Sequence, residues 1–332
     1  MNISSTGDLG DICYALNIIR QIPGAPHTLC LRSSPLTKAK GPDGVQRMFD
    51  ALAPLIRLQP YVGEFVIGDN LTPVDWKSED FRQRHFTKGE TLMQAHLNHL
   101  IKTRNMGRDF TAKKPWLLNV MPALRSKGRI VINRTARYRN DLFPWTELVA
   151  HYRHRLLFVG LRHEWKEFIG HHGYVEHQPT KDLLEVAQLI AGSDLFIGNQ
   201  SSAYAIAEGL KHASIQETNL EYPDCVYVRP NAQYAADGVV TLPDGTVLKG
   251  KRPPLEKNTM RVPPRGWNYA GYPSHPVFDL LVKEVSHREN ISFEEASDRV
   301  YGANVSRCPE FFTSHSDKVR LLRFEQAMEN SR

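Results

Sequence analysis

The sequence predicts an α/β protein of 332 residues with two doubly wound domains, each a parallel sheet covered by helices. Three observations carry this prediction. A glycine-containing turn joins a first apolar strand to a first apolar helix. Short apolar runs then alternate with segments of helical spacing. The alternation stops in a Pro-, Gly- and Lys/Arg-rich stretch, residues 113–129, and starts again after it. Because a single core stops growing at roughly 250–300 residues, we expect the chain to divide at this stretch.

The turn after the first strand is the most informative part of the chain. It contains Gly7, Asp8, Gly10 and Asp11 and leads into an apolar helix over residues 12–22. Backbone N–H groups and a helix N-terminus meet at such a turn, which suits a polar or anionic ligand. Asp11 lies where the helix is expected to begin, so it could accept a proton or simply be an N-cap. The glycine spacing is neither that of a dinucleotide-binding turn nor that of a P-loop.

The rest of the first half follows from periodicity. Apolar runs predict buried strands at residues 28–31 and 64–67, and helical spacing predicts a helix over residues 45–56. Residues 69–88 are polar and irregular, and a long helix is expected over residues 90–104.

The second half repeats the alternation and then changes character. Residues 225–228 read as a strand, and Pro243-Asp244-Gly245 reads as the turn of a hairpin. Residues 251–276 are Pro-rich and irregular, and residues 277–328 are helical. The strands expected before this change are residues 130–134, 156–160, 194–198 and 213–216, and the helices are residues 145–152, a short one near Trp165, 181–191 and 201–211. The predicted division is a first Rossmann-like domain at residues 1–122, a second at 123–272, and a helical tail at 273–332.

Composition restricts the partners and the location. The net charge is +6, which suits a phosphate-bearing partner such as a nucleotide-sugar, a lipid headgroup or a nucleic acid. No apolar run approaches the roughly 20 residues that span a bilayer, and no signal peptide is seen, so we expect a cytoplasmic protein without stable membrane insertion. The four cysteines are scattered without zinc-site spacing and read as reduced thiols.

Arginines follow the first strand of the second half. Arg134, Arg137 and Arg139 come directly after residues 130–133. Such arginines lie at the carboxyl edge of a sheet, where ligands of open α/β folds bind, and a guanidinium suits bidentate contact with phosphate. Solvated surface arginines explain each of the three about equally well.

Two later strand ends carry further candidates. Gly160 ends one strand and Glu164 follows it, where the carboxylate could contact a base or ribose or cap the next helix. The segment from Gly198 to Ser202 ends another strand and opens a helix of small residues. The N–H groups of that first helical turn form an anion site, although serines at a helix start are also ordinary N-caps.

In this order, the motifs resemble the ADP-heptose:lipopolysaccharide heptosyltransferase family, which consists of glycosyltransferases of the GT-B fold. The resemblance covers residues 1–22 and 129–216. It implies two domains of GT-B type, with the acceptor on the first and a nucleotide-sugar donor on the second. It also implies that Asp11 is the general base on the acceptor hydroxyl, in a loop with Gly7, Asp8 and Gly10.

The same resemblance implies a donor site at the strand ends of the second half. Family members typically carry Asp-Thr-Gly and then His in the last motif, where this chain has a different sequence, so the donor sugar stays open. The implied donor-binding residues are Arg134, Arg137, Arg139, Gly160, Glu164, Gly198, Asn199, Gln200, Ser201 and Ser202.

The implied reaction is an inverting, metal-independent sugar transfer from a nucleotide-diphosphate sugar, with no other cofactor. No D-x-D pair and no His/Asp cluster suited to a divalent ion is seen. The pairs His96/His99 and His151/His154 have helical metal spacing, but surface or packing roles explain them better.

The acceptor stays open between two classes. A saccharide is the usual acceptor of the family. A hydroxylated DNA base is the alternative, because DNA-modifying glycosyltransferases of phages also have the GT-B fold. Basic and aromatic residues mix at residues 76–86 and 261–272, which suits phosphate tracking and base stacking. A GT-B-like protein that binds without catalysis is a third reading, and a dehydrogenase is disfavoured because the glycine fingerprint is missing.

Overall fold

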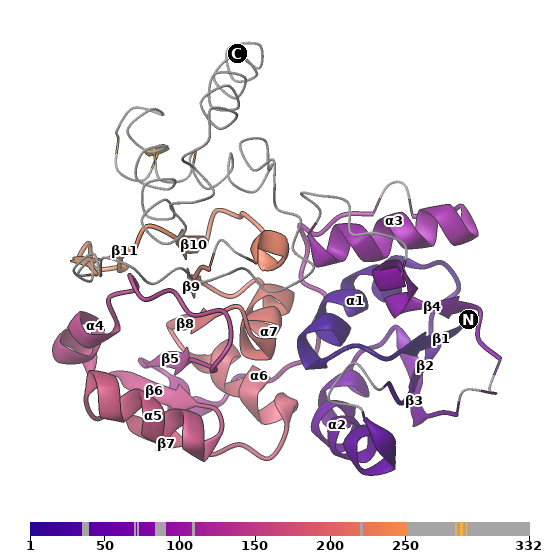
Figure 1. The fold of residues 1–332 in the computed structure, drawn as a ribbon, viewed down its shortest axis with the longest axis horizontal. Helices are drawn as coiled ribbons and strands as arrows, with labels where there is room; N and C mark the ends of the chain where they lie inside the picture. The colour runs from indigo at the N-terminus through magenta and orange to yellow at the C-terminus, as the bar shows by residue number, and fades with distance from the viewer. Residues whose placement is uncertain are drawn as a thin grey trace, which may run out of the picture.

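The structure is a computed structural model in which two α/β units lie side by side (Figure 1). The predicted tail and the Pro-rich stretch before it fall outside the described residues, except for four positions in the tail. The described residues are 1–34, 40–69, 71, 73–83, 91–107, 110–219 and 222–250, together with 283, 286, 287 and 290.

The first unit is built on a parallel four-stranded sheet in the order β3-β2-β1-β4. The chain therefore runs outward from β1 to β3 and crosses back to place β4 on the other side of β1. Its strands are β1 (Asn2–Ser5), β2 (His27–Leu31), β3 (Val62–Ile67) and β4 (Trp76–Lys77); its helices are α1 (Leu9–Gln21), α2 (Gly41–Ile56) and α3 (Leu92–Arg104), with a 3₁₀ helix at Ser78–Gln83.

The second unit has a parallel six-stranded sheet in the order β10-β9-β8-β5-β6-β7. This is the doubly wound order, with its crossover between β5 and β8, so both predicted sheets are confirmed. Its strands are β5 (Ile130–Asn133), β6 (Leu156–Val159), β7 (Glu176–Gln178), β8 (Leu195–Asn199), β9 (Ser214–Glu217) and β10 (Ala232–Ala235). Its helices are α4 (Trp145–Tyr152), α5 (Arg162–His172), α6 (Leu183–Gly192) and α7 (Ser202–Leu210), with 3₁₀ helices at Leu124–Ser126 and Pro223–Cys225. A separate hairpin joins β11 (Val239–Thr241) to β12 (Val247–Lys249), as the sequence predicts.

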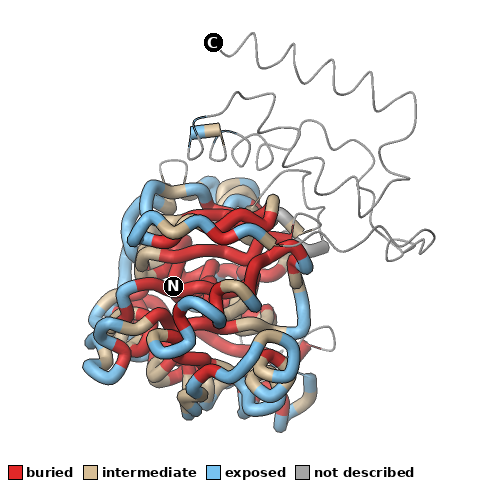
Figure 2. The backbone as a smooth tube through the Cα atoms, turned by 90° about the vertical axis from the view of Figure 1, so that its left-hand side faces the viewer, coloured by how far each residue is buried: buried red, intermediate tan, exposed pale blue. Residues whose placement is uncertain are grey.

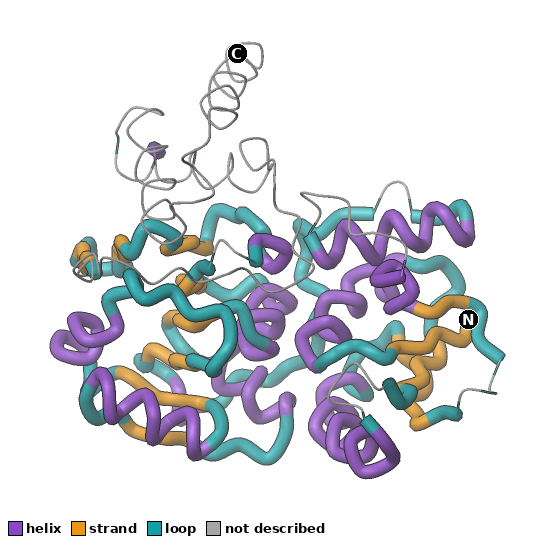
Figure 3. The backbone as a smooth tube through the Cα atoms, viewed as in Figure 1, coloured by secondary structure: helices purple, strands orange, loops and turns teal. Residues whose placement is uncertain are grey.

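Helices α1 and α7 form the centre of the junction between the units, as Figure 3 shows. Every residue from Ile12 to Ile19 and from Ala203 to Gly209 is buried. Helix turns that are buried on every side must be covered by other elements, and these two helices pack against each other. The result is one hydrophobic cluster that contains residues of both units. Figure 2 shows the buried residues along the interior of the backbone.

The connecting segment strengthens this junction. The indole N–H of Trp116 donates to the carbonyl of Cys13 in α1 at 2.8 Å, while the Trp116 backbone N–H donates to the carbonyl of Gly209 in α7 at 2.9 Å. A Cβ on Gly209 would lie 2.7 Å from the Leu117 side chain, so only glycine permits this approach. One residue of the connection thereby joins a helix of each unit.

Some predicted elements differ from the structure. Helix α1 begins at Leu9, three residues earlier than expected, because Asp8 caps it. The predicted strand at 225–228 is wrong: Tyr227 is buried against Tyr14, with ring centroids 4.9 Å apart, and β10 takes the sheet edge instead. Burial against a helix produced the strand-like pattern. The short strands β4, β7 and β10 were not predicted, because none of them is a continuous apolar run: they read Trp-Lys, Glu-His-Gln and Ala-Gln-Tyr-Ala.

Candidate functional site

The crossover points of the two sheets meet at the junction of the units. Ligands of open α/β sheets bind at such points, outside the carboxyl ends of the strands. A Cβ on Gly10, in the first turn of α1, would lie 3.7 Å from Cα of Ser202, the first residue of α7. The loop after β1 and the loops after β5 and β8 are therefore brought together, as the sequence motifs require.

The first loop supplies two carboxylates at the start of α1. Asp8 is the N-cap residue, and Asp11 is the third residue of the helix. Oδ2 of Asp11 accepts a hydrogen bond from the backbone N–H of Asp8 at 3.1 Å. Both charges lie at the positive end of the helix dipole, which stabilises them. A carboxylate accepts several hydrogen bonds at once, so capping is compatible with taking a proton.

A third carboxylate, not singled out in the sequence, lies beside this loop. Glu79 follows β4 and is buried, and its Oε1 accepts hydrogen bonds from the hydroxyls of Ser5 at 3.1 Å and Ser78 at 3.2 Å. A Cβ on Gly7 would lie 2.7 Å from both Asp11 Cβ and Glu79 Oε1. Gly7 therefore permits the two carboxylate side chains to close around the loop. No sequence signal pointed to Glu79, because β4 has only two residues.

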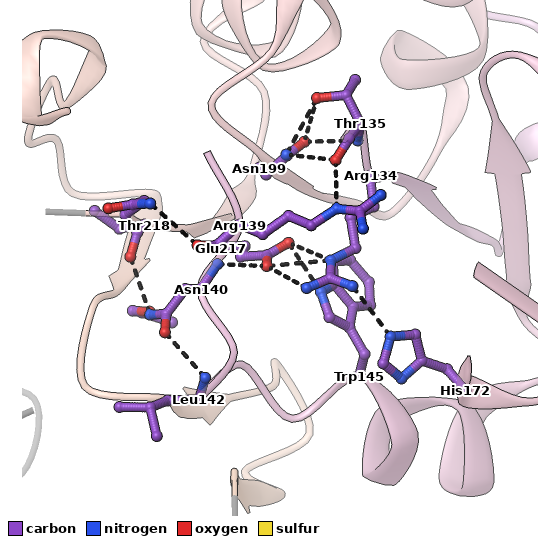
Figure 4. A network of polar contacts seen from close by, with 12 residues as sticks. Arg134, Thr135, Arg139, Asn140, Leu142, Trp145, His172, Asn199, Glu217 and Thr218 are labelled. Carbon is purple, nitrogen blue, oxygen red and sulfur yellow. Dashed lines mark hydrogen bonds and ion pairs between the residues drawn. The ribbon is translucent and has the colours of Figure 1, made fainter. Parts of the chain in front are cut away.

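Arg134 is engaged by a buried carboxylate that the sequence analysis also missed (Figure 4). Its Nε and Nη2 donate to Glu217 Oε2 at 3.0 Å and Oε1 at 2.9 Å, and the Glu217 side chain is completely buried. The indole of Trp145 and the backbone N–H of Asn140 donate to the same carboxylate at 2.9 and 2.8 Å. Glu217 ends β9, so an acidic residue at a strand's carboxyl end was the available signal.

His172 lies on the other side of the Arg134 guanidinium. Its Nε2 is 3.2 Å from Nη1 of Arg134, and its Nδ1 is 3.0 Å from the hydroxyl of Thr146. Burial, and then the positive charge of Arg134, lower the pKa of His172 to about 4. The imidazole is therefore neutral at neutral pH, with Nε2 accepting from the guanidinium.

Arg139 is held by an acid on α5. Its two terminal nitrogens donate to Glu167 Oε1 at 2.5 Å and Oε2 at 2.9 Å. This bond from Arg139 holds the pKa of Glu167 below its usual value. Arg139 and Arg134 are thus both in bidentate pairs within the second unit.

Asn199, the last residue of β8, organises the segment that carries the arginines. Its Oδ1 accepts from the backbone N–H of Thr135 at 3.1 Å, and its Nδ2 donates to the carbonyls of Thr135 and Arg137. The side chain is fully buried. Asn199 therefore fixes the backbone between Thr135 and Arg137 across the crossover between β5 and β8.

Gln200 and Ser201, which follow Asn199, also make hydrogen bonds to neighbouring loops. Gln200 accepts from the backbone N–H of Asn219 at 2.7 Å and donates to the carbonyl of Tyr222. Ser201 is the N-cap of α7, and its hydroxyl donates to Asn133 Oδ1 at 2.8 Å. The side chains of this turn thus hold the neighbouring loops, and the Ser201 hydroxyl also accepts from the backbone N–H of Tyr204 in the first turn of α7.

Arg137 is the arginine that reaches the other unit. Its Nη1 lies 3.6 Å from Oδ2 of Asp8, and its side chain is 58% exposed. The next residue, Tyr138, has a left-handed backbone (φ 56°), and its ring lies 4.5 Å from that of Tyr222. Such strain is characteristic of functional sites. Burial raises the pKa of Tyr138 to about 12.

Gly160 and Glu164 form the turn between β6 and α5. Oε2 of Glu164 accepts from the backbone N–H of Leu161 at 3.0 Å, so the carboxylate caps the helix. Gly160 has a φ of 148°, and a Cβ there would lie 2.9 Å from the Asn133 amide nitrogen. Capping was one of the two roles expected for Glu164.

Two cavities flank the meeting point. One, of about 310 Å³, lies between the arginine segment and α5, and its lining is charged. The other, of about 340 Å³, lies between α1 and α2 and is lined by Leu9, Gly44, Arg47, Met48 and Ala51. Both volumes fall in the range of roughly 300–1,000 Å³ that small-molecule sites occupy. The lining of the first cavity consists of seven ionisable residues and two phenylalanines: Arg134, Arg139, Asp141, Phe143, Glu164, Glu167, Phe168, His171 and His172.

Other sequence candidates have packing roles. His96 and His99 are buried against Trp76, with ring centroids 6.5 and 6.3 Å apart from it. Trp76 is only 2% exposed. Among the described residues, no three His, Cys, Asp or Glu side chains are grouped to hold a metal ion. In that same part of the chain, no helix is long and apolar enough to span a bilayer.

No protein-family model and no curated protein matches the chain. Solved structures do match. E. coli heptosyltransferase WaaC with ADP-2-deoxy-2-fluoro heptose is 15% identical, with 70% of this chain and 92% of that chain covered and a TM-score of 0.41. A glycosyl transferase family 9 structure from Veillonella parvula DSM 2008 is 10% identical, covers 70% and 85%, and has a TM-score of 0.45. The iron-containing dodecameric glycosyltransferase TibC from enterotoxigenic E. coli H10407 is 14% identical, covers 70% and 61%, and has a TM-score of 0.41. WaaC is a heptosyltransferase, and the other two are glycosyltransferases.

Proposed function

We propose that the protein is an inverting glycosyltransferase that moves a sugar from a nucleoside-diphosphate sugar to an acceptor hydroxyl without a metal ion. One observation carries the proposal. The carboxylate loop of the first unit, Asp8 to Asp11, lies against the strand ends of the second unit where we place the anion site, with Gly10 beside Ser202 and Asp8 beside Arg137. A base and a phosphate site on opposite walls are what a transfer between two substrates needs.

Asp11 is the proposed base. It lies in the first turn of α1, partly exposed, with its position fixed by the bond to Asp8 N–H. As the acceptor oxygen attacks the anomeric carbon, its proton passes to the Asp11 carboxylate. The bond between the anomeric carbon and the diphosphate oxygen breaks with its electron pair on the diphosphate. Attack from the opposite face inverts the configuration.

The second unit is the proposed donor side. The start of α7 directs backbone N–H groups toward the junction, and Arg137 adds a positive charge there. These groups would stabilise the charge that accumulates on the leaving diphosphate. The charged cavity beside Glu164 and His172 offers room for the nucleoside. Arg134 and Arg139 are proposed to shape this cavity through their carboxylate partners.

A saccharide is the acceptor that we propose, and a hydroxylated DNA base is the second candidate. The cavity beside Leu9 adjoins the Asp11 loop and offers an acceptor site on the first unit. Among the basic and aromatic residues on which the DNA alternative rests, Trp76 cannot stack on a base, because its indole is buried. Most other residues of that mixture lie outside the described part of the chain.

The test is donor binding and transfer measured separately. Wild type and Asp11→Asn are titrated with ADP, UDP, GDP and CDP and assayed with the matching nucleotide-sugars. Asparagine can still accept from Asp8 N–H, so the fold and donor affinity should persist while turnover falls about 10²–10⁴-fold. Asp182→Asn, at the N-cap of α6, is the matched control and should keep full turnover.

The outcomes separate the three readings. Lost turnover with intact nucleotide binding supports Asp11 as the base. Nucleotide binding without transfer to any saccharide or to hydroxymethylated DNA favours a binding protein. Equal turnover of wild type and Asp11→Asn would remove Asp11 from the mechanism, and binding of no nucleotide would overturn the donor site.

A further inference from the structure

The ion pair between Asp8 and Arg137 links the two walls of the proposed site. Oδ2 of Asp8 is 3.6 Å from Nη1 of Arg137, and the two side chains are 25% and 58% exposed. Asp8 belongs to the loop that carries the proposed base, and Arg137 to the segment of the proposed donor side. The pair therefore joins the acceptor wall to the donor wall.

Arg137 differs from its two neighbours in how it is held. Arg134 and Arg139 are in bidentate pairs at 2.5–3.1 Å, each with a carboxylate of its own unit. The pair of Arg137 is longer, more exposed and reaches the other unit. Exposed ion pairs of this kind are weak, so a stronger anion can replace the carboxylate. Of the three arginines, Arg137 is the one that can exchange its partner without breaking a buried network.

The backbone under Arg137 is already fixed. Asn199 donates to the carbonyl of Arg137, and the guanidinium carbon lies 5.4 Å from the centroid of the Tyr138 ring. A change of partner therefore needs rotation of the side chain and no movement of the segment. Asp8, as the N-cap of α1, remains at the positive end of the helix dipole after Arg137 leaves.

From this geometry we infer that, before the donor binds, the Asp8 carboxylate occupies the position beside the Arg137 guanidinium that a donor phosphate later takes. The inference rests on the proposed function and identifies the diphosphate of a nucleoside diphosphate as the competing anion. Donor binding moves the Arg137 guanidinium from Asp8 to the diphosphate and thereby removes one contact between the walls. Asp8 acts as an internal competitor that lowers donor affinity and releases the acceptor loop when the donor arrives.

The test is the substitution Asp8→Asn, which removes the charge and keeps a good N-cap residue. Inorganic pyrophosphate and ADP are the probes, and their dissociation constants are measured by calorimetry at low salt. Without its competitor, Arg137 should bind each probe about two- to fivefold more tightly. Arg137→Gln should weaken binding about tenfold or more, because it removes a charge-assisted contact.

The double variant and a control show whether the gain passes through Arg137. In the Arg137→Gln background, Asp8→Asn should change the affinity less than about 1.5-fold, because the competition no longer exists. Asp182→Asn removes the same charge from another N-cap and should change nothing. A gain that persists without Arg137, or that Asp182→Asn reproduces, would be a general charge effect and would overturn the inference.

Two further outcomes are decisive. Unchanged or weaker probe binding by Asp8→Asn overturns the competition, whereas the glycosyltransferase assignment would stand if transfer activity is found. Binding of neither probe nor any other nucleoside diphosphate, by wild type or variants, overturns the proposed function itself. The two failures are therefore distinguishable.

Discussion

Glu217 and Arg134 form an ion pair across the end of β8. Arg134 follows β5, Glu217 ends β9, and β8 lies between those two strands in the sheet. The guanidinium therefore reaches over the end of the middle strand to a carboxylate that is fully buried. Asn199, at the end of that middle strand, fixes the segment that carries Arg134 by accepting from the backbone N–H of Thr135. The proposed donor wall is consequently preorganised by contacts between residues far apart in the chain.

Glu217→Gln tests how much the Arg134–Glu217 pair contributes to the free energy of unfolding. Removing the charge leaves the guanidinium of Arg134 largely buried without its counter-ion, so the free energy of unfolding should fall by about 3–5 kcal/mol. Glu176→Gln breaks the more exposed pair with Arg129 and should cost less than about 1 kcal/mol. Urea denaturation of both variants makes the comparison. Equal costs would mean that the buried pair contributes no more than a surface one.

Gly7→Ala tests the close packing of the carboxylate loop. The new methyl group would lie 2.7 Å from Asp11 Cβ and from Glu79 Oε1, so we expect a loss of about 1–3 kcal/mol and displacement of Asp11. Gly10→Ala is the matched control, because its methyl would lie 3.7 Å from Ser202 Cα, an ordinary contact. Thermal unfolding and transfer assays should rank Gly7→Ala well below Gly10→Ala. The opposite order would show that the loop adapts.

Asn199→Asp tests the support of the arginine segment. A carboxylate cannot donate to the carbonyls of Thr135 and Arg137, so stability should fall by about 1–3 kcal/mol. Hydrogen exchange of the amides at residues 135–138 should accelerate. Ser201→Ala removes the bond to Asn133 and makes a useful contrast, since exchange in that segment should stay slow. Unchanged exchange in Asn199→Asp would mean that other contacts fix the segment.

His172 predicts a dependence of stability on acid. Its folded pKa is lowered to about 4, below the ordinary value of 6.5, by burial and then by Arg134. The unfolded imidazole therefore takes a proton first as the pH falls, and stability decreases from about pH 6.5 toward pH 4. His172→Gln should reduce the proton uptake on unfolding at pH 5 by up to about one proton. Burial likewise lowers the pKa of His212 to about 4. A variant that lacks both histidines should therefore show a larger reduction in proton uptake on unfolding. An unchanged slope in His172→Gln would contradict the assignment.

Local patterns predicted the two sheets well. The strands β5, β6 and β8 are short apolar runs at expected positions, because a strand buried on both faces has little freedom in composition. β7 reads Glu-His-Gln, a composition that does not predict a strand, and it is a strand because it pairs with β6. Pairing with a neighbouring strand therefore decides the structure of this short segment.

The candidate site was predictable in position and less so in role. The loops at Arg134 and Asn199 do meet, because parallel strands of one sheet place their carboxyl ends at one edge. The Asp11 loop belongs to the other sheet, and the packing of α1 against α7 brings it beside them. The engagement of Arg134 by Glu217 could not be foreseen, since the two residues are 83 positions apart. Glu79 passed unnoticed because the two-residue strand before it gave no signal. Long-range charge pairs need the fold before they can be seen.

The central turns of α1 and α7 are buried between the two units, so we expect the units to be inherited together. A domain that exposes little apolar surface when separated can be duplicated or exchanged between genes, but each unit here would uncover the largely apolar central turns of a helix. Recombination between them would have to supply a matching helix at once. Change in this fold is therefore expected to come through its loops and not by exchange of whole halves.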